Sequence, residues 1–546
     1  MLFNSYQFIL LFLPITLFIC FFIAHRGRAD LAQFWLIVAS LFFYATWNWR
    51  YLPLLLGSIT ANYVVAQAIR RSDSEKTRSR LLILAAVFNL SLLCYYKYTD
   101  FFLTTSNDVA GTHFSIQHII LPLGISFYTF QQLTLLVDLS KGKTHDLRFR
   151  DFLLFVIFFP HLIAGPIVHH REMMPQFEKA TYRLDWQNMA VGAALFSIGL
   201  FKKAVLADGI ANHVSPLFAD AAAGHPMSLF YAWGAAIGFT LQIYFDFSGY
   251  SEMALGLARM VGIKLPMNFN SPLKSASIVE YWSRWHITLT RFLTAYLYNP
   301  LAVALSRRRL DKGKGVLAGT RTTPGAFFEL VALPSTYTMF LSGLWHGAGY
   351  QYLVFGLLHG FYLTVNHAWR LFRPKLWKDH AQYQRVMRPF GIALTFVSVL
   401  VAMSFFHAES VPAAWNVVSG MAGANGVALP EFLSGHIPAL AALLPRIGVT
   451  LAPGGGAEFL ALFLWIAALL PIVWLAPNVL EILRDYEPAI TAGAPSTPGS
   501  KPWILPTLYG ALRWTPSPRW AVLGAVLAAG GFLALNQVSE FLYWQF

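Results

Sequence analysis

The chain has 546 residues, of which 56% are hydrophobic and only 12% are charged. Soluble domains carry about 25% charged residues, so this composition excludes an ordinary soluble protein and predicts a polytopic membrane protein. The formal net charge of +14 does not indicate nucleic-acid binding, because Lys and Arg lie in short loops between apolar segments.

Apolar segments that are candidate membrane helices follow one another along the chain. They are Tyr6–Ala24, Leu31–Trp47, Tyr51–Ile69, Leu81–Tyr96, Ile119–Leu136, Phe152–Val168, Met189–Leu206, Leu229–Phe247, Phe328–Leu344, Tyr350–Trp369, Phe390–Phe406, Glu458–Trp474 and Trp520–Leu535. Several fall short of the roughly 20 residues that a spanning helix needs. We therefore expect about 11–13 transmembrane and re-entrant helices, some of them tilted.

Lysine and arginine gather in alternate loops, which predicts the orientation of the chain. Basic residues follow the first, third and fifth segments and recur at 307–314 and 370–378, whereas loops 100–118 and 407–458 are poor in them. Because basic loops stay in the cytoplasm, we expect both termini on the opposite side. The first segment lacks a basic start and a small-residue cleavage site, so we expect it to be retained as a helix.

The two cysteines, Cys20 and Cys94, both lie within apolar segments. They show neither a disulfide framework nor the spacing of metal ligands, so we predict buried or lipid-facing thiols and no metal site.

Polar residues inside apolar segments are costly in a bilayer and mark either function or a buried pair. In the first such group Pro160 and Gly165 interrupt an apolar run at His161. Broken backbone at membrane depth is tolerated only where protein or water surrounds it. A kinked helix end with a structural histidine and a substrate contact both fit this pattern, and we favour the former slightly.

The second group places Asp246, Glu252 and Arg259 in apolar surroundings. Two carboxylates can perform acid–base chemistry. We favour structural ion pairs with Arg259, Arg284 or Arg291, because a buried pair holds a shape even where it adds little stability.

The third group repeats a histidine after a tryptophan. Glu280–Leu289 has helical character, with Trp282, His286 and Leu289 on one side. His346 follows at a glycine-rich turn between two apolar segments, which predicts a hairpin in which small residues allow close approach of a ligand. Spacing alone leaves a structural and a catalytic role equally open.

The run Arg284–Leu289 resembles the first histidine motif of the membrane-bound O-acyltransferase (MBOAT) superfamily. Leu344–Ala348 resembles the second motif, whose histidine is the family's catalytic residue. Other blocks resemble its bacterial, alginate O-acetyltransferase-like branch for polysaccharide acetylation: Pro122–Gln131, Ala164–Ile167, Tyr244–Tyr250, Asn268–Pro272 and Phe541–Phe546. The chain departs from the branch at Ala295, where an aspartate is usual, and at His407, where an arginine is common.

The resemblance implies an all-α polytopic fold, with a ring of tilted helices around a central funnel or tunnel. It implies one membrane domain over residues 1–546, with a catalytic core at about 119–370 and peripheral helices at 1–100 and 389–546. The expected activity is O-acetyl transfer at the bacterial inner membrane, with periplasmic termini. Acetyl-CoA is expected as a substrate, with no cofactor. The expected acceptor is an exopolysaccharide such as alginate, or a periplasmic acetyltransferase partner.

Within this reading, we expect His346 to be the base that deprotonates an acceptor hydroxyl at the donor thioester. His286 is expected to support the donor tunnel or to orient His346. A covalent acyl-histidine stays open as an alternative. The remaining candidates are Trp285, Trp345 and Trp282 as tunnel walls, Ser342 and Asn268 as polar contacts of the acyl group, and Asp246 and Arg284 as structural residues.

Two other functions compete with acetyl transfer. A related enzyme could move a D-alanyl or longer acyl group from a carrier-protein thioester. A transporter could use the intramembrane histidines as a proton relay, but transporters commonly contain paired repeats and no internal repeat is visible in this sequence.

Overall fold

The computed structural model of the chain describes residues 1–142, 147–432, 443–452, 454–491, 510 and 512–536. Helices dominate this part, and its single sheet is a ladder of two parallel strands, β1 (Val427–Pro430) and β2 (Val449–Ala452). The expected all-α membrane fold is therefore confirmed. The segment Phe541–Phe546, which contributed to the family resemblance, lies outside the described residues.

The bounds of the helices follow in chain order. The first are η1 (Phe8–Phe12), α1 (Leu13–His25), α2 (Ala29–Asn48), η2 (Trp49–Tyr51), α3 (Leu52–Arg71) and α4 (Glu75–Ala110). Next come α5 (Ile125–Ser140), α6 (Phe149–Ile157), α7 (Phe159–Leu162), α8 (His170–Lys179), α9 (Trp186–Phe201), η3 (Lys202–Ala207), α10 (Asp208–Ala222) and α11 (Leu229–Met260). The central group holds η4 (Pro272–Lys274), α12 (Ile278–Trp282), α13 (Ile287–Leu293), η5 (Thr294–Tyr298), α14 (Asn299–Asp311), η6 (Gly319–Arg321), α15 (Pro324–Phe327), η7 (Phe328–Ala332), α16 (Leu333–His346) and α17 (Tyr350–Leu376). The last are α18 (His380–His407), α19 (Val411–Met421), η8 (Pro445–Ile447), α22 (Gly456–Leu475), α23 (Val479–Ile482), η9 (Arg484–Tyr486), α25 (Pro518–Leu533) and η10 (Ala534–Asn536).

Seven helical segments in the described part are long and apolar enough to cross a membrane: Phe8–His25, Ala29–Arg71, Glu75–Ala110, Trp186–Ala222, Pro324–His346, Ala381–His407 and Gly456–Leu475. Other apolar runs form shorter or interrupted helices. The run at 152–168 breaks after Ile157, as its proline and glycine predicted, and the run at 119–136 becomes helical only from Ile125. Short helices at membrane depth require surrounding protein to satisfy their ends.

Three of the π-helices end two residues before a proline. η1 precedes Pro14, η5 precedes Pro300 and η7 precedes Pro334. Proline lacks a backbone N–H and clashes with the carbonyl of the preceding turn. A widened π turn accommodates that clash while the helix continues, so these segments cross the proline without a break.

Helices α9 and α11 pack closely through glycine pairs. A Cβ added to Gly192 or Gly199 would lie 2.7 Å from the carbonyl oxygen of Gly256 and 2.5 Å from that of Gly249, respectively. The reciprocal contacts of Gly249 and Gly256 are equally short, at 2.7 and 2.5 Å. Small residues that let helix backbones approach are the usual means of packing in a membrane, where burial of apolar side chains provides little driving force.

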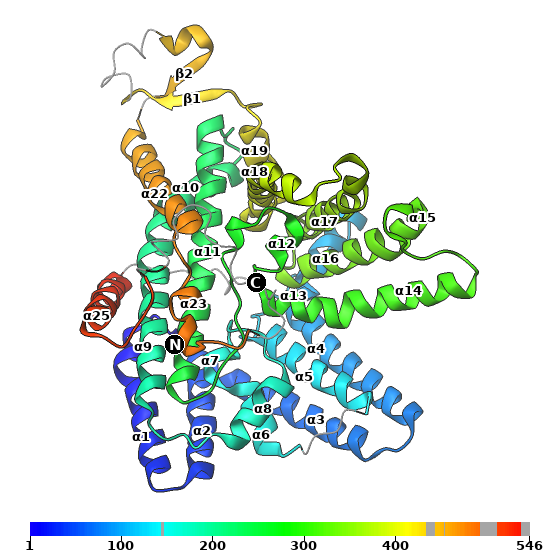
Figure 1. The fold of residues 1–546 in the computed structure, drawn as a ribbon, viewed down its shortest axis with the longest axis vertical. Coiled ribbons are helices and arrows are strands. Elements are labelled where there is room, and N and C mark those ends of the chain that lie inside the picture. Colours follow the sequence, from blue (N-terminus) through cyan, green and yellow to red (C-terminus); the bar gives the residue numbers. More distant parts are fainter. Residues whose placement is uncertain (143–146, 433–442, 453, 492–509, 511, 537–546) are drawn as a thin grey trace.

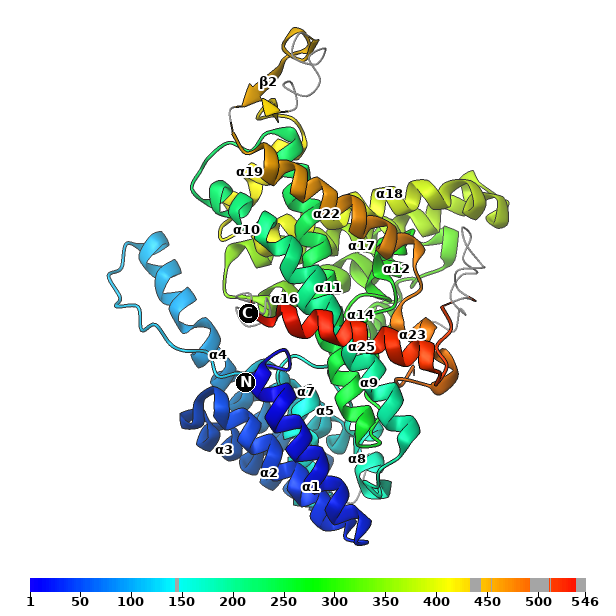
Figure 2. The same ribbon diagram turned by 90° about the vertical axis from the view of Figure 1, so that its left-hand side faces the viewer.

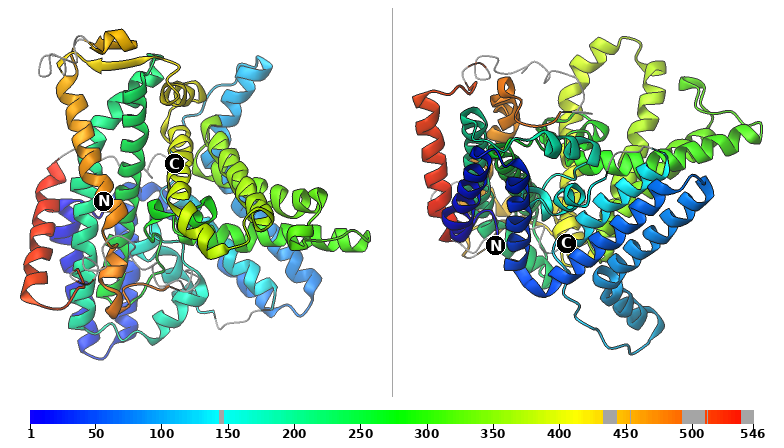
Figure 3. Two further views of the ribbon diagram at one scale, coloured as in Figure 1. Left: turned by 45° about the horizontal axis from the view of Figure 1, so that its top comes forward. Right: turned by 90° about the horizontal axis from the view of Figure 1, so that it is seen from below.

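The short helices α12 and α13 lie among α11, α16 and α17 near the middle of the molecule, whereas the β ladder and the α1–α2 loop lie at opposite ends (Figures 1 and 2). Both views of Figure 3 place α25 on the side opposite the protruding helix α14. The segment of α12 and α13 thus lies inside the helical assembly, and the division into a catalytic core and peripheral helices stays a prediction.

Candidate active site

His346 is the last residue of α16, at the turn of the expected hairpin with α17. Its side chain is buried, and its ring lies edge-on to Phe406, with 5.1 Å between centroids, and to Phe355, with 5.8 Å. The hairpin closes tightly: a Cβ on Gly343 would lie 2.2 Å from the carbonyl oxygen of Tyr352. The glycine-rich turn therefore places an imidazole inside an aromatic surround.

His286 lies where the chain breaks between α12 and α13. The expected continuous helical face of Trp282, His286 and Leu289 is wrong, because α12 ends at Trp282 and His286 adopts a left-handed conformation with φ of 43°. The side chain of Asn268 organises this break. Its Oδ1 accepts hydrogen bonds from Nδ1 of His286 at 3.2 Å and from the hydroxyl of Thr288 at 2.6 Å. Since a carbonyl oxygen only accepts, Nδ1 of His286 carries the proton.

A third buried histidine, His359 of α17, joins the same cluster. Nε1–H of Trp282 donates to Nδ1 of His359 at 3.2 Å, and the His359 ring lies 4.7 Å from that of Phe355. Phe355 thus contacts the rings of both His359 and His346. The sequence reasoning missed His359, although a histidine inside the apolar run Tyr350–Trp369 carried the same signal as the other intramembrane ionisable groups.

Trp345 connects the two predicted histidines. The centroid of its indole lies 6.2 Å from that of His286 and 4.8 Å from that of His346. Trp285 lies nearby, packed edge-on against Phe269 at 5.0 Å and stacked on Tyr281 at 5.7 Å. The structure therefore brings His286, His346, Trp282, Trp285 and Trp345 into one buried region. Their roles stay predictions.

Two hydroxyl groups share the face of α16 that carries His346. Ser342 and Thr338 precede His346 by one and two turns, and both side chains are buried. Neither hydroxyl has a hydrogen-bond partner among the described residues. Buried hydroxyls are usually paired, so this stripe presents polar groups suited to a ligand.

The buried ion pairs differ from those expected. Asp246 pairs with Lys203 of η3 at 2.5 Å, and Glu252 pairs with Lys202 at 2.6 Å. The predicted pairing with arginines is wrong, because the chain positions two lysines in a π turn facing α11, which local spacing did not reveal. The arginines have other acidic partners: Arg284 pairs with Glu280, and Arg291 with Glu172.

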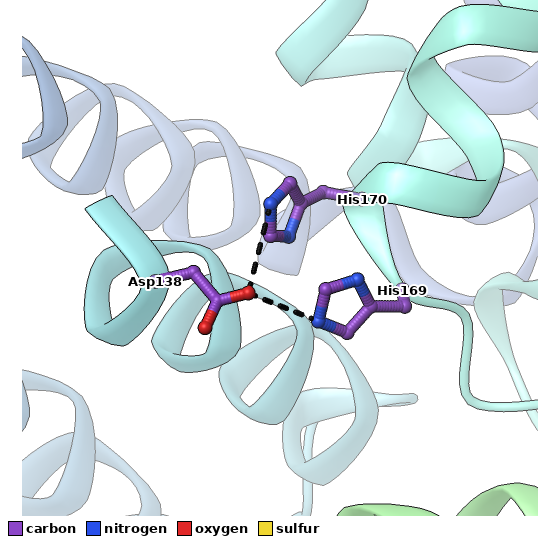
Figure 4. Close-up of side chains that lie close together, drawn as sticks. All are labelled: Asp138, His169 and His170. Carbon is purple, nitrogen blue, oxygen red and sulfur yellow. Dashed lines mark ion pairs between the residues drawn. The ribbon is translucent and has the colours of Figure 1, made fainter. Parts of the chain in front are cut away.

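Asp138, His169 and His170 form a separate polar cluster between α5 and α8, in which both imidazoles point toward the carboxylate (Figure 4). Oδ2 of Asp138 lies 3.3 Å from Nε2 of His169 and 3.9 Å from Nε2 of His170. These are the residues in the described part whose atoms lie close enough together to hold a metal ion.

Arg171 makes this cluster an ion-pair network more readily than a metal site. Its guanidinium lies 3.2 Å from the same Asp138 oxygen, so a protein cation already faces the carboxylate. Burial opposes ionisation here, but the hydrogen bond with His169 and the charges of His169, Arg171 and His170 lower the pKa of Asp138 to about 2. We interpret the cluster as an ion-pair network that joins α5 to α8.

The chemistry available at the centre follows from its composition. Imidazole nitrogens can accept and return a proton, and hydroxyl groups can orient a polar substrate, and here both lie buried among aromatic side chains. Groups of this kind suit transfer between two bound substrates better than hydrolysis, because water would compete for any reactive intermediate.

Comparison with known proteins places these residues in context. The sequence model of MBOAT, the membrane-bound O-acyltransferase family, matches residues 10–318, which include Asn268 and His286 and end before His346. The chain is 41% identical over 458 residues to a peptidoglycan O-acetyltransferase of Helicobacter pylori, covering 79% of this chain and 81% of that protein. It is 35% identical over 431 residues to a probable alginate O-acetylase AlgI of Pseudomonas aeruginosa, covering 77% and 75%. A teichoic acid D-alanyltransferase of Streptococcus thermophilus is 27% identical over 293 residues, covering 52% of this chain and 68% of its own length.

Proposed function

Since the chain belongs to the membrane-bound O-acyltransferase family, we propose that this multi-pass membrane acyltransferase moves acetyl groups from acetyl-CoA to an extracytoplasmic polysaccharide. The donor binds from the cytoplasm and the acceptor from the other side of the inner membrane. The acceptor is the polymer itself or a periplasmic partner that completes the transfer.

The observation that carries this proposal is the position of His346. It ends α16 at a tight hairpin, is buried among aromatic rings, and lies one turn beyond the unpartnered hydroxyl of Ser342. Acyl transfer needs a base next to a bound thioester in a site from which water is excluded.

The proposed reaction is a direct displacement. His346 takes the proton from the acceptor hydroxyl, the oxygen forms a bond to the acetyl carbonyl carbon, and the carbon–sulfur bond of the donor breaks. The proton then passes to the leaving thiolate, so free coenzyme A and an acetyl ester are the products. Proton transfer to a positioned base contributes about 10²- to 10⁴-fold to such reactions.

The other central residues receive supporting roles. His286 orients the region around Trp345 through its bond to Asn268. Ser342 contacts the acyl group, and Trp282, Trp285 and Trp345 wall the donor path. Asp246 joins α11 to η3 through its ion pair with Lys203, and Arg284 pairs locally with Glu280, one helical turn earlier in the chain.

Two comparisons guide the choice of acyl group and acceptor. The two relatives named for O-acetyl transfer are more similar and cover more of this chain than the D-alanyltransferase does, which favours acetyl over D-alanyl. The relative named for peptidoglycan is more similar than the one named for alginate, which favours a glycan of the cell wall as the first acceptor to test.

The test is acetyl transfer from radiolabelled acetyl-CoA by purified protein in nanodiscs, with wild type beside His346→Ala. Glycan fragments, alginate oligomers and, in a separate reaction, D-alanyl carrier protein serve as alternative substrates. We expect label on a glycan and a loss of about 10²- to 10⁴-fold in the variant, with an unchanged elution profile and thermal unfolding.

Each contrary result identifies the step that is wrong. Activity only with the D-alanyl carrier protein would show that acetyl-CoA is not the donor. Equal activity of wild type and His346→Ala would show that His346 is not the base. Solute movement without any acyl donor would support the transporter.

A further inference from the structure

Lys97 and Tyr98 of α4 reach the last turn of α16, directly before His346. The ammonium group of Lys97 donates a hydrogen bond to the carbonyl oxygen of Trp345, and the hydroxyl of Tyr98 donates to that of Leu344 at 2.8 Å. The last four carbonyls of a helix lack partners within it. A helix more than 200 residues away in the sequence thus supplies donors for two of them.

The amino group of Lys97 faces a helix end and not an acidic side chain. No carboxylate in the described part of the chain lies within ion-pair distance of it. The negative end of the α16 dipole and the Trp345 carbonyl provide the opposite charge instead. Its Nζ also lies 5.8 Å from the centre of the Trp345 ring. An ionisable side chain in such a position inside a membrane segment indicates function by default.

Both the side chain and the backbone carbonyl of Trp345 are fixed by contacts with neighbouring helices. Its indole packs against Phe127 and Phe130 of α5, with centroids 5.7 and 5.8 Å away, while Lys97 of α4 binds its carbonyl. Because His346 follows Trp345 directly, any movement of the Trp345 carbonyl changes where the imidazole points.

We propose that Lys97 is a positioning residue that fixes the end of α16, and with it His346, for acetyl transfer, with Tyr98 as a weaker second anchor. The inference rests on the proposed function, since it requires His346 to act as the base. Loss of the anchor lowers the turnover rate rather than donor binding, because a misplaced base fails in the reaction step.

Lys97→Met tests this directly, since it keeps the length of the side chain and removes its donor. We expect kcat to fall about 10- to 100-fold while KM for acetyl-CoA stays within about twofold. Tyr98→Phe should lower kcat by a smaller factor. The matched control is Tyr95→Phe on the same helix, where the tyrosine is 57% exposed, and it should leave kcat unchanged.

A rescue experiment separates positioning from general folding damage. Lys97→Cys is prepared in a background of Cys20→Ala and Cys94→Ala and treated with 2-bromoethylamine, which restores an ammonium at nearly the original length. Recovery of at least about one third of the background kcat after complete alkylation, verified by mass spectrometry, supports the role.

Three outcomes would overturn the inference. The first is a wild-type kcat for Lys97→Met. The second is no increase in kcat when a folded Lys97→Cys variant is completely alkylated. The third applies if the Lys97 variants do not fold, and it is a wild-type kcat for Tyr98→Phe. In each, activity of the wild type and inactivity of His346→Ala would show that the proposed function still holds. If the wild type itself transfers no acetyl, the proposed function fails and the positioning role falls with it.

Discussion

Asn268 carries much of the local order around His286. Its side-chain oxygen accepts three hydrogen bonds, from Nδ1 of His286, the Thr288 hydroxyl and the Thr288 backbone N–H, and its amide donates to Ser251 of α11 at 3.3 Å. A single side chain therefore sets the protonated nitrogen of His286 and ties the α12–α13 break to a long neighbouring helix.

Replacing Asn268 with alanine should affect stability and activity together. The donors of His286 and Thr288 lose their acceptor, at a cost of about 1–3 kcal/mol for a buried unsatisfied group. We expect a lower thermal unfolding temperature and reduced kcat in the nanodisc assay. Asn270→Ala is the control, because Asn270 pairs with Asn478 and not with His286. Equal losses in both variants would argue against a specific role for Asn268.

For Ser342 we expect replacement by alanine to reduce activity without reducing stability. Its hydroxyl is fully buried without a partner among the described residues, and an unpaired buried polar group costs about 1–3 kcal/mol, so Ser342→Ala should raise the thermal unfolding temperature rather than lower it. Activity should nevertheless drop if the hydroxyl contacts the acyl group. Ser404→Ala serves as the control, because that equally buried hydroxyl donates to Leu400 of its own helix. Unaltered kcat and KM in Ser342→Ala would remove the serine from the substrate path.

At the scale of the element, the hairpin of α16 and α17 depends on a seam of glycines. A Cβ on Gly356 would lie 2.4 Å from the carbonyl oxygen of Met339, and one on Gly360 would lie 2.9 Å from Cα of Thr336. With Gly343, these contacts bring the two backbones together over several turns and hold His346 beside Phe355.

Gly343→Ala should therefore separate the two helices and displace His346. Its Cβ would meet backbone, which cannot rotate away, so we expect lower thermal stability and reduced acetyl transfer. Gly524→Ala in α25 is the matched control: nothing lies within 4 Å of its added Cβ, and removing a helical glycine there should stabilise by about 0.5–1 kcal/mol. Similar thermal stability and acetyl transfer in the two variants would contradict the claim that close glycine contacts hold the hairpin together.

At the scale of the molecule, the expected orientation makes a prediction about labelling. The basic α1–α2 loop and the β ladder lie at opposite ends (Figure 1). A cysteine replacing Arg28 should react with an impermeant maleimide only after permeabilisation, whereas one replacing Thr450 should react in intact spheroplasts. Both are read in a background of Cys20→Ala and Cys94→Ala. The reverse labelling pattern would show that the chain has the opposite orientation, with the β ladder in the cytoplasm, and would contradict the proposed side for the acceptor.

Much of the molecule could be predicted from local sequence. The apolar runs predicted the membrane class and most long helices, because a bilayer imposes nearly continuous apolar residues on each span. The glycine-rich turn before Tyr350 predicted the hairpin at His346, and Pro160 with Gly165 predicted the break in the apolar run. These are short-range properties, decided by residues a few positions apart.

Other features arose only from contacts between distant segments. The ion pairs Lys202–Glu252 and Lys203–Asp246, the hydrogen bond between His286 and Asn268, and the Lys97 bond to Trp345 join residues that lie between 18 and 248 positions apart. The sequence by itself determined the class, most of the long helices and two of the central histidines, since hydropathy and motif spacing are local. Only the tertiary structure decided which polar groups meet, because a buried donor pairs with whichever acceptor the packed helices bring within hydrogen-bond distance.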